Sequence, residues 1–255
     1  MKALDLYKKL PKKNCGKCSL KACLPFAISV IKGDTPLDEC LLLSPEEIDI
    51  MKPSLVSGDW REELILKLCD EIKTLNLARI APGIGAEMQG SDLRLSCFGR
   101  EFFVSPDGGI KTEAKTTAWI RILILHYIRT AGKEDLTGRW VSYRELKAGM
   151  VKHSSFVREC EEPLRELFQK DFEKVVAVLV RLGAHMCEGF PTEHAWVLSL
   201  LPKVPVAVLY WPDEEEFPAR MTVLFDSTAD KYLDVESLMF LIEELVKNIG
   251  SLVSC

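Results

Sequence analysis

The sequence predicts an α+β fold, in which a small helical module precedes a larger domain with an antiparallel sheet packed by helices. Helical and strand-like patterns are segregated along the 255 residues, which favours α+β over a parallel, doubly wound sheet. Four of the nine cysteines lie within the first 40 residues, whereas the other five are scattered singly. This uneven distribution distinguishes the N-terminal module from the rest of the chain.

The composition is typical of a folded cytoplasmic protein. Hydrophobic residues make up 47% of the chain, so a substantial core is available. The formal net charge of -5 argues against a nucleic-acid binder, which is usually strongly basic. The N-terminus lacks the apolar run of a signal peptide, and the longest apolar stretches are too short or too charged to cross a bilayer. We therefore expect no membrane span and no nucleic-acid partner.

The chain divides into a module at residues 1–43, a helical linker at 44–74 and an α+β domain at 75–255. Residues 1–40 carry a net charge of +4, which leaves -9 for the remainder. Ser44, followed by Pro45 and two glutamates, predicts a helix start, because serine caps helix N-termini and acids favour the first turn. Ser57-Gly58 adds a linker-like break.

The middle of the chain is predicted to be mostly helical. Apolar residues have helical spacing in these segments: 60–75, 115–130, 155–168 and 172–182. The second of these is apolar on most faces, and Ala131-Gly132 supplies its stop. Residues 92–98 and 101–105 are two short segments separated by Gly99-Arg100, and apolar residues alternate with polar ones in the first. This pattern predicts a β-hairpin.

The last third is predicted to be a meander of three strands and a closing helix. Residues 195–201, 204–211 and 220–225 are rich in valine, leucine and aromatic residues, and proline-containing turns separate them. Residues 234–246 have the pattern of an amphipathic helix.

The N-terminal cysteines have the spacing Cys15-x2-Cys18-x4-Cys23-x16-Cys40. Each iron atom of a [4Fe-4S] cube needs one outside thiolate, and one tight loop can supply three of them while a distant segment supplies the fourth. Gly16 permits a tight wrap. The apolar run after Cys23 predicts a helix that walls the site and ends at Gly33. Structural zinc is usually bound by two close cysteine pairs, and Cys23 and Cys40 are not a close pair. A zinc site and free or disulfide-bonded cysteines remain the alternatives to a cluster.

The module also has non-cysteine positions of its own. They form the pattern Leu10-Pro11-x2-Asn14-Cys15-x2-Cys18-x4-Cys23-x2-Phe26-Ala27, with a later glycine and Cys40. Over about residues 5–42 this pattern resembles the small four-cysteine [4Fe-4S] domain of the corrinoid iron-sulfur protein large subunit. The resemblance implies one low-potential cluster liganded by Cys15, Cys18, Cys23 and Cys40.

The rest of the chain carries a second set of motifs. They are Gly90-x2-Leu93-x-Leu95-x2-Phe98-Gly99-Arg100, Leu125-His126-Tyr127, Leu136-Thr137-Gly138-Arg139-Trp140-Val141-Ser142, Leu201-Pro202-x-Val204-Pro205, Trp211-x4-Glu216-Phe217-Pro218 and Leu224-Phe225-Asp226. Over about residues 75–250 they resemble an uncharacterised domain family of anaerobic bacteria and archaea, found alone or behind this cysteine module. That resemblance implies no known activity.

Six lysines surround the cysteine motif: Lys8, Lys9, Lys12, Lys13, Lys17 and Lys21. Because a cluster with four thiolates is a net anion, nearby cations favour its reduced form. They could also dock an acidic redox partner. The plain alternative is a solvated face.

Residues 75–250 contain no catalytic motif. His126, His153, His185 and His194 form no metal-binding pair in the sequence. His185 and Cys187 with His194 suggest a metal or corrinoid ligand site, although structural histidines are commoner. The acidic run at 213–216 has the pattern of a solvated loop tip. Large aromatic residues, such as Trp196 and Tyr210, suggest either a pocket or the core.

These observations favour an electron-transfer or redox-accessory protein for a corrinoid or one-carbon-metabolism partner in an anaerobe. No region resembles the corrinoid-binding barrel of the first family, so the corrinoid would belong to the partner protein. Two alternatives remain: a redox enzyme with its active site in residues 75–250, or a binding protein with a structural cluster.

Overall fold

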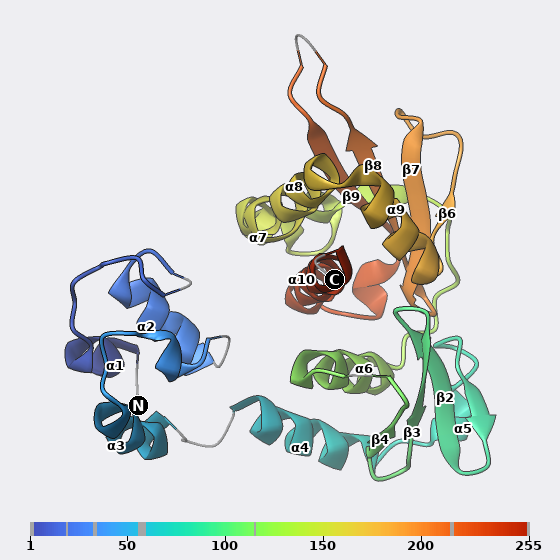
Figure 1. Ribbon diagram of the computed structural model, residues 1–255. Coiled ribbons are helices and arrows are strands. Elements are labelled where there is room, and N and C mark those ends of the chain that lie inside the picture. Colours follow the sequence, from blue (N-terminus) through green and yellow to red (C-terminus); the bar gives the residue numbers. More distant parts are fainter. Residues whose placement is uncertain are drawn as a thin grey trace. The chain divides into compact units, whose positions relative to one another are not determined.

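The structure is a computed structural model that describes residues 3–18, 20–32, 35–55, 60–114, 116–214 and 217–253. The chain forms two compact units, Met1–Leu64 and Ile65–Cys255 (Figure 1). The predicted stop at Gly33 and the break at Ser57-Gly58 lie outside the described residues. Helices and antiparallel sheets confirm the α+β class. The three-part division with a separate linker stays a prediction.

Unit 1 is a small helical module. Its elements are α1 (Ala3–Lys9), α2 (Cys23–Lys32), a 3-10 turn (Leu37–Glu39) and α3 (Pro45–Leu55). They pack around a core that includes Leu6, Phe26 and Met51. The predicted helix start at Ser44 is confirmed, because the backbone N–H of Glu47 donates to Ser44 Oγ at 3.2 Å and the N–H of Ser44 donates to Glu47 Oε2 at 2.8 Å.

Unit 2 contains a four-stranded antiparallel sheet in the order β1-β2-β3-β4. Its strands are β1 (Glu87–Gln89), β2 (Asp92–Cys97), β3 (Arg100–Val104) and β4 (Ile110–Lys111). The predicted hairpin is confirmed as β2 and β3. Its turn places Phe98 (φ 51°) and Gly99 (φ 68°) in the left-handed region, as a two-residue hairpin turn requires. Phe98 adopts this conformation although it is not glycine; its ring is buried and its N–H donates to Leu200 O at 3.0 Å.

The second sheet of unit 2 has five antiparallel strands in the order β5-β9-β8-β7-β6. They are β5 (Trp140–Ser142), β6 (His185–Met186), β7 (His194–Leu201), β8 (Val204–Trp211) and β9 (Arg220–Asp226). The predicted meander is confirmed as the central strands β7, β8 and β9. The edge strands β5 and β6 have only three and two residues, too few for alternation to be visible in the sequence.

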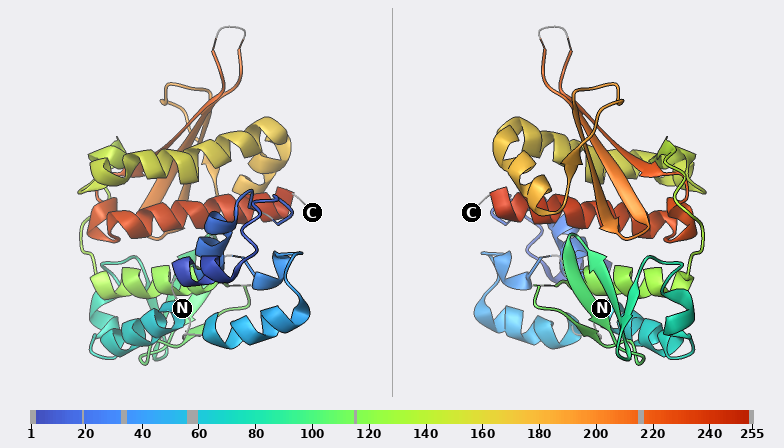
Figure 2. Two further views of the ribbon diagram at one scale, coloured as in Figure 1. Left: turned by 90° about the vertical axis from the view of Figure 1, so that its left-hand side faces the viewer. Right: turned by 90° about the vertical axis from the view of Figure 1, so that its right-hand side faces the viewer.

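Helices cover these sheets in unit 2. They are α4 (Trp60–Ile72), which begins in unit 1, α5 (Leu77–Ile80), α6 (Ala118–Thr130), α7 (Gly149–Phe156), α8 (Glu162–Lys170), α9 (Phe172–Arg181) and α10 (Val235–Val253). The long helix α10 contacts α6 as well as α7, α8 and α9 (Figure 2). The α6 contact includes Trp119 stacked on Phe240, with ring centroids 4.1 Å apart.

Two predicted helices differ in detail from the structure. The helix expected at 155–168 is part of a longer helical stretch that begins at Gly149 and contains a π-helical turn, Val157–Glu161. The closing helix continues beyond residue 246 to Val253. Helix α6 ends as predicted, but Ala131 itself takes the left-handed conformation (φ 47°).

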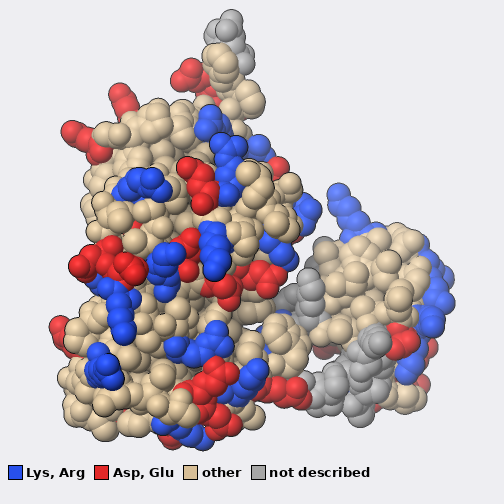
Figure 3. Space-filling model, turned by 180° about the vertical axis from the view of Figure 1, so that it is seen from behind, with Lys and Arg blue, Asp and Glu red and all other residues tan. Residues whose placement is uncertain are grey.

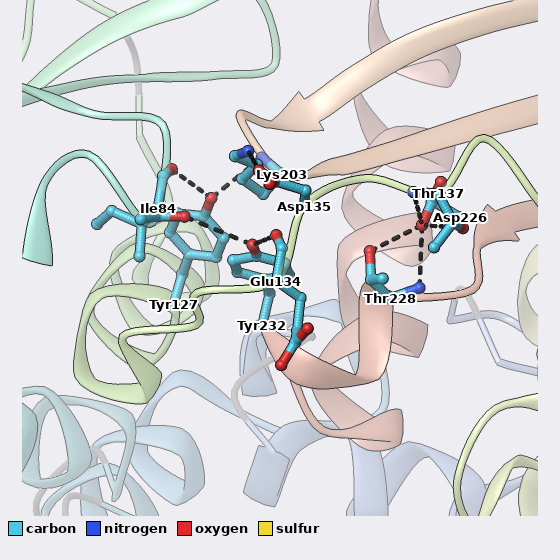
Figure 4. A network of polar contacts seen from close by, with 10 residues as sticks. Ile84, Tyr127, Glu134, Asp135, Thr137, Lys203, Asp226, Thr228 and Tyr232 are labelled. Carbon is cyan, nitrogen blue, oxygen red and sulfur yellow. Dashed lines mark hydrogen bonds and ion pairs between the residues drawn. The ribbon is translucent and has the colours of Figure 1, made fainter.

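Polar contacts in unit 2 connect α6, the loop after α5, the turn between β7 and β8, and the end of β9 (Figure 4). Tyr127 Oη donates to Ile84 O at 2.6 Å and accepts from the N–H of Lys203 at 3.0 Å. The Asp226 carboxylate accepts from the backbone N–H of Gly138 at 2.7 Å and of Thr228 at 3.0 Å. Burial alone would raise the pKa of Asp226, but the hydrogen bonds hold that pKa below its ordinary value.

We expect Tyr127→Phe to lower the free energy of unfolding of unit 2 by about 1–3 kcal/mol, because it leaves a buried carbonyl and an N–H without their partner. Urea unfolding of the full chain, followed by tryptophan fluorescence, measures this change. Tyr210→Phe is the matched control: Tyr210 is 4% exposed, and its hydroxyl donates to no described residue. Equal losses in the two variants would contradict a stabilising role for the Tyr127 hydrogen bonds.

Candidate metal centre

The four N-terminal cysteines line a single cavity in unit 1. Its other lining residues are Pro11, Asn14, Gly16, Lys17, Leu20, Ala22, Phe26, Leu41 and Leu42. All four cysteines are free thiols. The chain therefore brings together four sulfur atoms that lie up to 25 positions apart in the sequence.

The loop that carries the first two cysteines is tightly curled. Lys12, Asn14 and Gly16 have φ values of 55°, 44° and 66°, so three of five consecutive residues are left-handed. Glycine adopts this conformation without strain, and asparagine tolerates it better than most residues do. A Cβ at Gly16 would meet nothing within 4 Å, so backbone conformation and not crowding favours glycine there. This confirms the tight wrap predicted at Gly16.

Asn14 links this loop to the start of α2. Its Oδ1 accepts a hydrogen bond from the backbone N–H of Cys23 at 2.8 Å, and Cys23 is the first residue of that helix. The first N–H groups of a helix have no partner within the helix, and Asn14 satisfies this one. The side chain therefore holds Cys23 against the loop that bears Cys15 and Cys18.

The thiols differ in their exposure to solvent. Cys15 is exposed, Cys18 and Cys23 are half-buried, and Cys40 is 9% exposed. Cys40 follows the 3-10 turn, where the buried Leu37 anchors the returning chain. Phe26, on the apolar face of α2, is 1% exposed and lines the cavity, as predicted for a wall formed by that helix. One side of the cavity is thus apolar, while Cys15 reaches the surface.

In the part of the chain that the structure describes, no three His, Cys, Asp or Glu side chains gather closely enough to hold a single metal ion. The four cysteines share the lining of the cavity without forming such a group. The same finding applies to the site suggested at His185, Cys187 and His194, which the structure does not assemble.

The histidines of unit 2 have separate surroundings. His126 Nδ1 lies 2.8 Å from Ser237 Oγ; burial and the nearby Arg129 lower the pKa of His126, so its neutral form is favoured. His194 packs edge-on against Phe172, with ring centroids 5.1 Å apart. His185 is exposed on the edge strand β6. These surroundings favour a structural role for the histidines over the suggested metal or corrinoid ligand site.

The remaining candidates of unit 2 also have structural surroundings. Asp213 Oδ1 accepts from the N–H of Ala219 at 2.6 Å, which stabilises the loop between β8 and β9. Residues 215–216 of the acidic run lie outside the described residues. Trp196 and Tyr210 are both buried and pack against Phe168, so they belong to the core.

Two family models match the chain. Residues 76–248 match the family described as "Domain of unknown function (DUF3786)". The chain belongs to this family. Residues 10–42, which include all four cavity cysteines, match the family described as "Putative Fe-S cluster". Both resemblances found in the sequence are thereby confirmed, with the DUF3786 domain following the cysteine module.

Two curated relatives are similar to a short stretch of the chain that includes the cysteine module. The chain is 47% identical over 45 residues to the acetyl-CoA decarbonylase/synthase complex subunit gamma of Methanothermobacter thermautotrophicus. These 45 residues are 18% of this chain and 10% of the relative. It is 49% identical over 41 residues to the corrinoid/iron-sulfur protein large subunit of Moorella thermoacetica. These 41 residues are 16% of this chain and 9% of that relative. The chain thus spans about a tenth of the length of these relatives.

No solved structure matches the chain. Among the described residues, no helix has the length and apolar character needed to cross a membrane.

The family match and the relatives support an iron-sulfur cofactor in the N-terminal module. The sequence pattern predicts the four cysteines of the site, whereas the hydrogen bond from the Cys23 N–H to Asn14 emerges from the structure. Its signal was an asparagine directly before the first cysteine.

We expect Asn14→Ala to lower the iron retained by the purified protein, because it removes the acceptor for the Cys23 N–H and places alanine in a left-handed conformation. Asn14→Asp is the matched variant, since it keeps an acceptor oxygen at the same position, and it should retain iron close to the wild-type amount. Iron analysis of anaerobic preparations measures both. If both variants lose iron equally, the hydrogen bond does not position Cys23.

Proposed function

We propose that the chain is an electron-transfer protein that holds one [4Fe-4S] cluster through Cys15, Cys18, Cys23 and Cys40. The observation that carries this proposal is the single cavity lined by all four thiols. The iron-sulfur family match over residues 10–42 supports the kind of cofactor. The spacing of the cysteines supports the cubane type, because one loop offers three ligands and a distant segment the fourth.

The arrangement of the thiols favours a cluster over zinc. Four thiolates around one zinc ion each lie about 2.3 Å from the metal, so they are only about 3.8 Å from one another. In a cubane cluster each thiolate binds its own iron atom, and the sulfur atoms lie further apart. Cys23 and Cys40 are not a close pair in the sequence, which suits the second arrangement better than a zinc site.

The residues around the cavity suit one-electron chemistry. When bound, the cluster would supply a site that gains and loses one electron. Phe26 and Leu20 keep water from one side, and Lys17 on the cavity wall favours the additional negative charge of a reduced site. The exposed Cys15 would leave one edge close to the surface, where a partner protein can approach.

We propose a corrinoid or one-carbon-metabolism protein as the partner. The names of the relatives support this, since one is a corrinoid/iron-sulfur protein and the other belongs to an acetyl-CoA decarbonylase/synthase complex. Because this chain shares only about 45 residues with them, the corrinoid would belong to the partner protein. The DUF3786 domain would then serve to present the module or to bind the partner.

Cys15→Ala should lose most of its iron, whereas Cys187→Ala, a half-buried cysteine of unit 2, should retain it. Wild-type protein purified without oxygen should contain about four iron atoms and four sulfides per chain. Dithionite should convert the cluster to a paramagnetic state visible by electron paramagnetic resonance.

Zinc without sulfide in the wild-type preparation would refute the cluster. Iron that dithionite cannot reduce would favour a structural role over electron transfer. Equal iron loss from Cys187→Ala would refute the ligand assignment.

A further inference from the structure

The loop around the first three cysteines is the most basic part of unit 1. Residues 11–23 contain four lysines and no acidic residue. The four are all exposed: Lys12, Lys13, Lys17 and Lys21. Figure 3 shows lysine side chains gathered along one edge of this unit. The acidic residues nearest in sequence to the cavity wall are Asp38 and Glu39, which precede Cys40.

These lysines lie at the cavity itself. Lys17 is a lining residue. Lys12 and Lys13 stand between Pro11 and Asn14, which both line the cavity, and Lys21 directly precedes the lining residue Ala22. Because neighbouring Cα atoms are about 3.8 Å apart, each of these backbone positions lies beside the cavity wall.

Apolar side chains complete the rim of the cavity. Leu41 is 71% exposed and Leu42 is 37% exposed, and both line the cavity. Leu24, on the first turn of α2, is also 37% exposed. Unit 1 thus presents a mixed surface, with exposed leucines beside the thiols and lysines on the neighbouring loop. Protein interfaces commonly have this plan of an apolar centre and a charged rim.

We propose that this surface, formed by Leu41, Leu42 and the lysines of residues 11–23, docks an acidic one-electron carrier protein. This inference rests on the proposed electron-transfer function and names the chemistry of the protein that supplies the electron. The carrier in its reduced form gives one electron to the oxidised cluster, and no bond forms or breaks. The lysines attract the acidic protein and raise its association rate, while the leucines hold it over the exposed Cys15 edge.

A protein suits the surface better than an anionic membrane does. Helices that bind membranes carry a broad apolar face along their length. Here α1 and α2 have only 7 and 10 residues, and the exposed leucines Leu41 and Leu42 lie outside both helices. The apolar area is a small patch beside the thiols, which suits a compact contact between two proteins.

The test is the rate at which an acidic flavodoxin, reduced to its hydroquinone, reduces the full-length protein in a stopped-flow experiment. For the wild type, this rate should fall as ionic strength rises. The double variant Lys13→Glu/Lys21→Glu should be reduced at least about tenfold more slowly at low ionic strength, since electrostatic steering is reversed. Leu41→Ala should lower the rate at protein concentrations where complex formation limits it.

The matched control is Lys67→Glu/Lys170→Glu, which makes the same change in net charge with exposed lysines of unit 2. It should keep the wild-type rate. Dithionite, a small reductant, should reduce all variants to the same final extent, which shows that the cluster itself is intact.

Equal flavodoxin rates for the two double variants would overturn the docking surface and leave the proposed function standing. Binding of the wild type, but not of Lys13→Glu/Lys21→Glu, to phosphatidylglycerol vesicles with unchanged flavodoxin rates would assign the surface to a membrane and also overturn it. Failure of dithionite to reduce the wild type would instead refute electron transfer.

Discussion

The cavity of unit 1 depends on a small apolar core that holds three separate segments of the chain against one another. Cys15 and Cys18 lie on the curled loop, Cys23 begins α2, and Cys40 follows the 3-10 turn. Leu10, Phe26 and Leu37 are buried at the points where these segments meet the core. A module of this size buries little apolar surface, so a cluster bound by all three segments would contribute directly to its folding free energy.

Unit 2 uses its polar groups in a different way. The Tyr127 and Tyr143 hydroxyls and the Asp226 carboxylate form hydrogen bonds with backbone groups of neighbouring elements. The histidines that suggested a metal site lie in separate surroundings. Burial raises the pKa of the Cys97 and Cys160 thiols, so they stay protonated and unreactive. The cavity lined by four thiols lies in unit 1, whereas unit 2 carries the match to the DUF3786 family.

Charge is distributed along the chain in the same unequal way. The N-terminal 40 residues are basic although the chain as a whole is acidic. Near a site that would carry negative charge, cations both stabilise the reduced form and attract acidic proteins. The exposed leucines beside the thiols are costly to leave in water, and a partner that covers them would recover part of that free energy.

Local patterns in the sequence determined much of the architecture. Cysteine spacing singled out the module, alternation predicted the hairpin and the central meander, and Ser44 with Glu47 marked the start of α3, because each signal involves neighbouring residues. Tertiary structure alone decided the rest. The edge strands β5 and β6 exist only through pairing with distant strands, and the π-helical turn interrupts a stretch that reads as a regular helix. The common cavity of the four thiols and the hydrogen bond from the Cys23 N–H to Asn14 likewise depend on how separate segments of the module pack against one another.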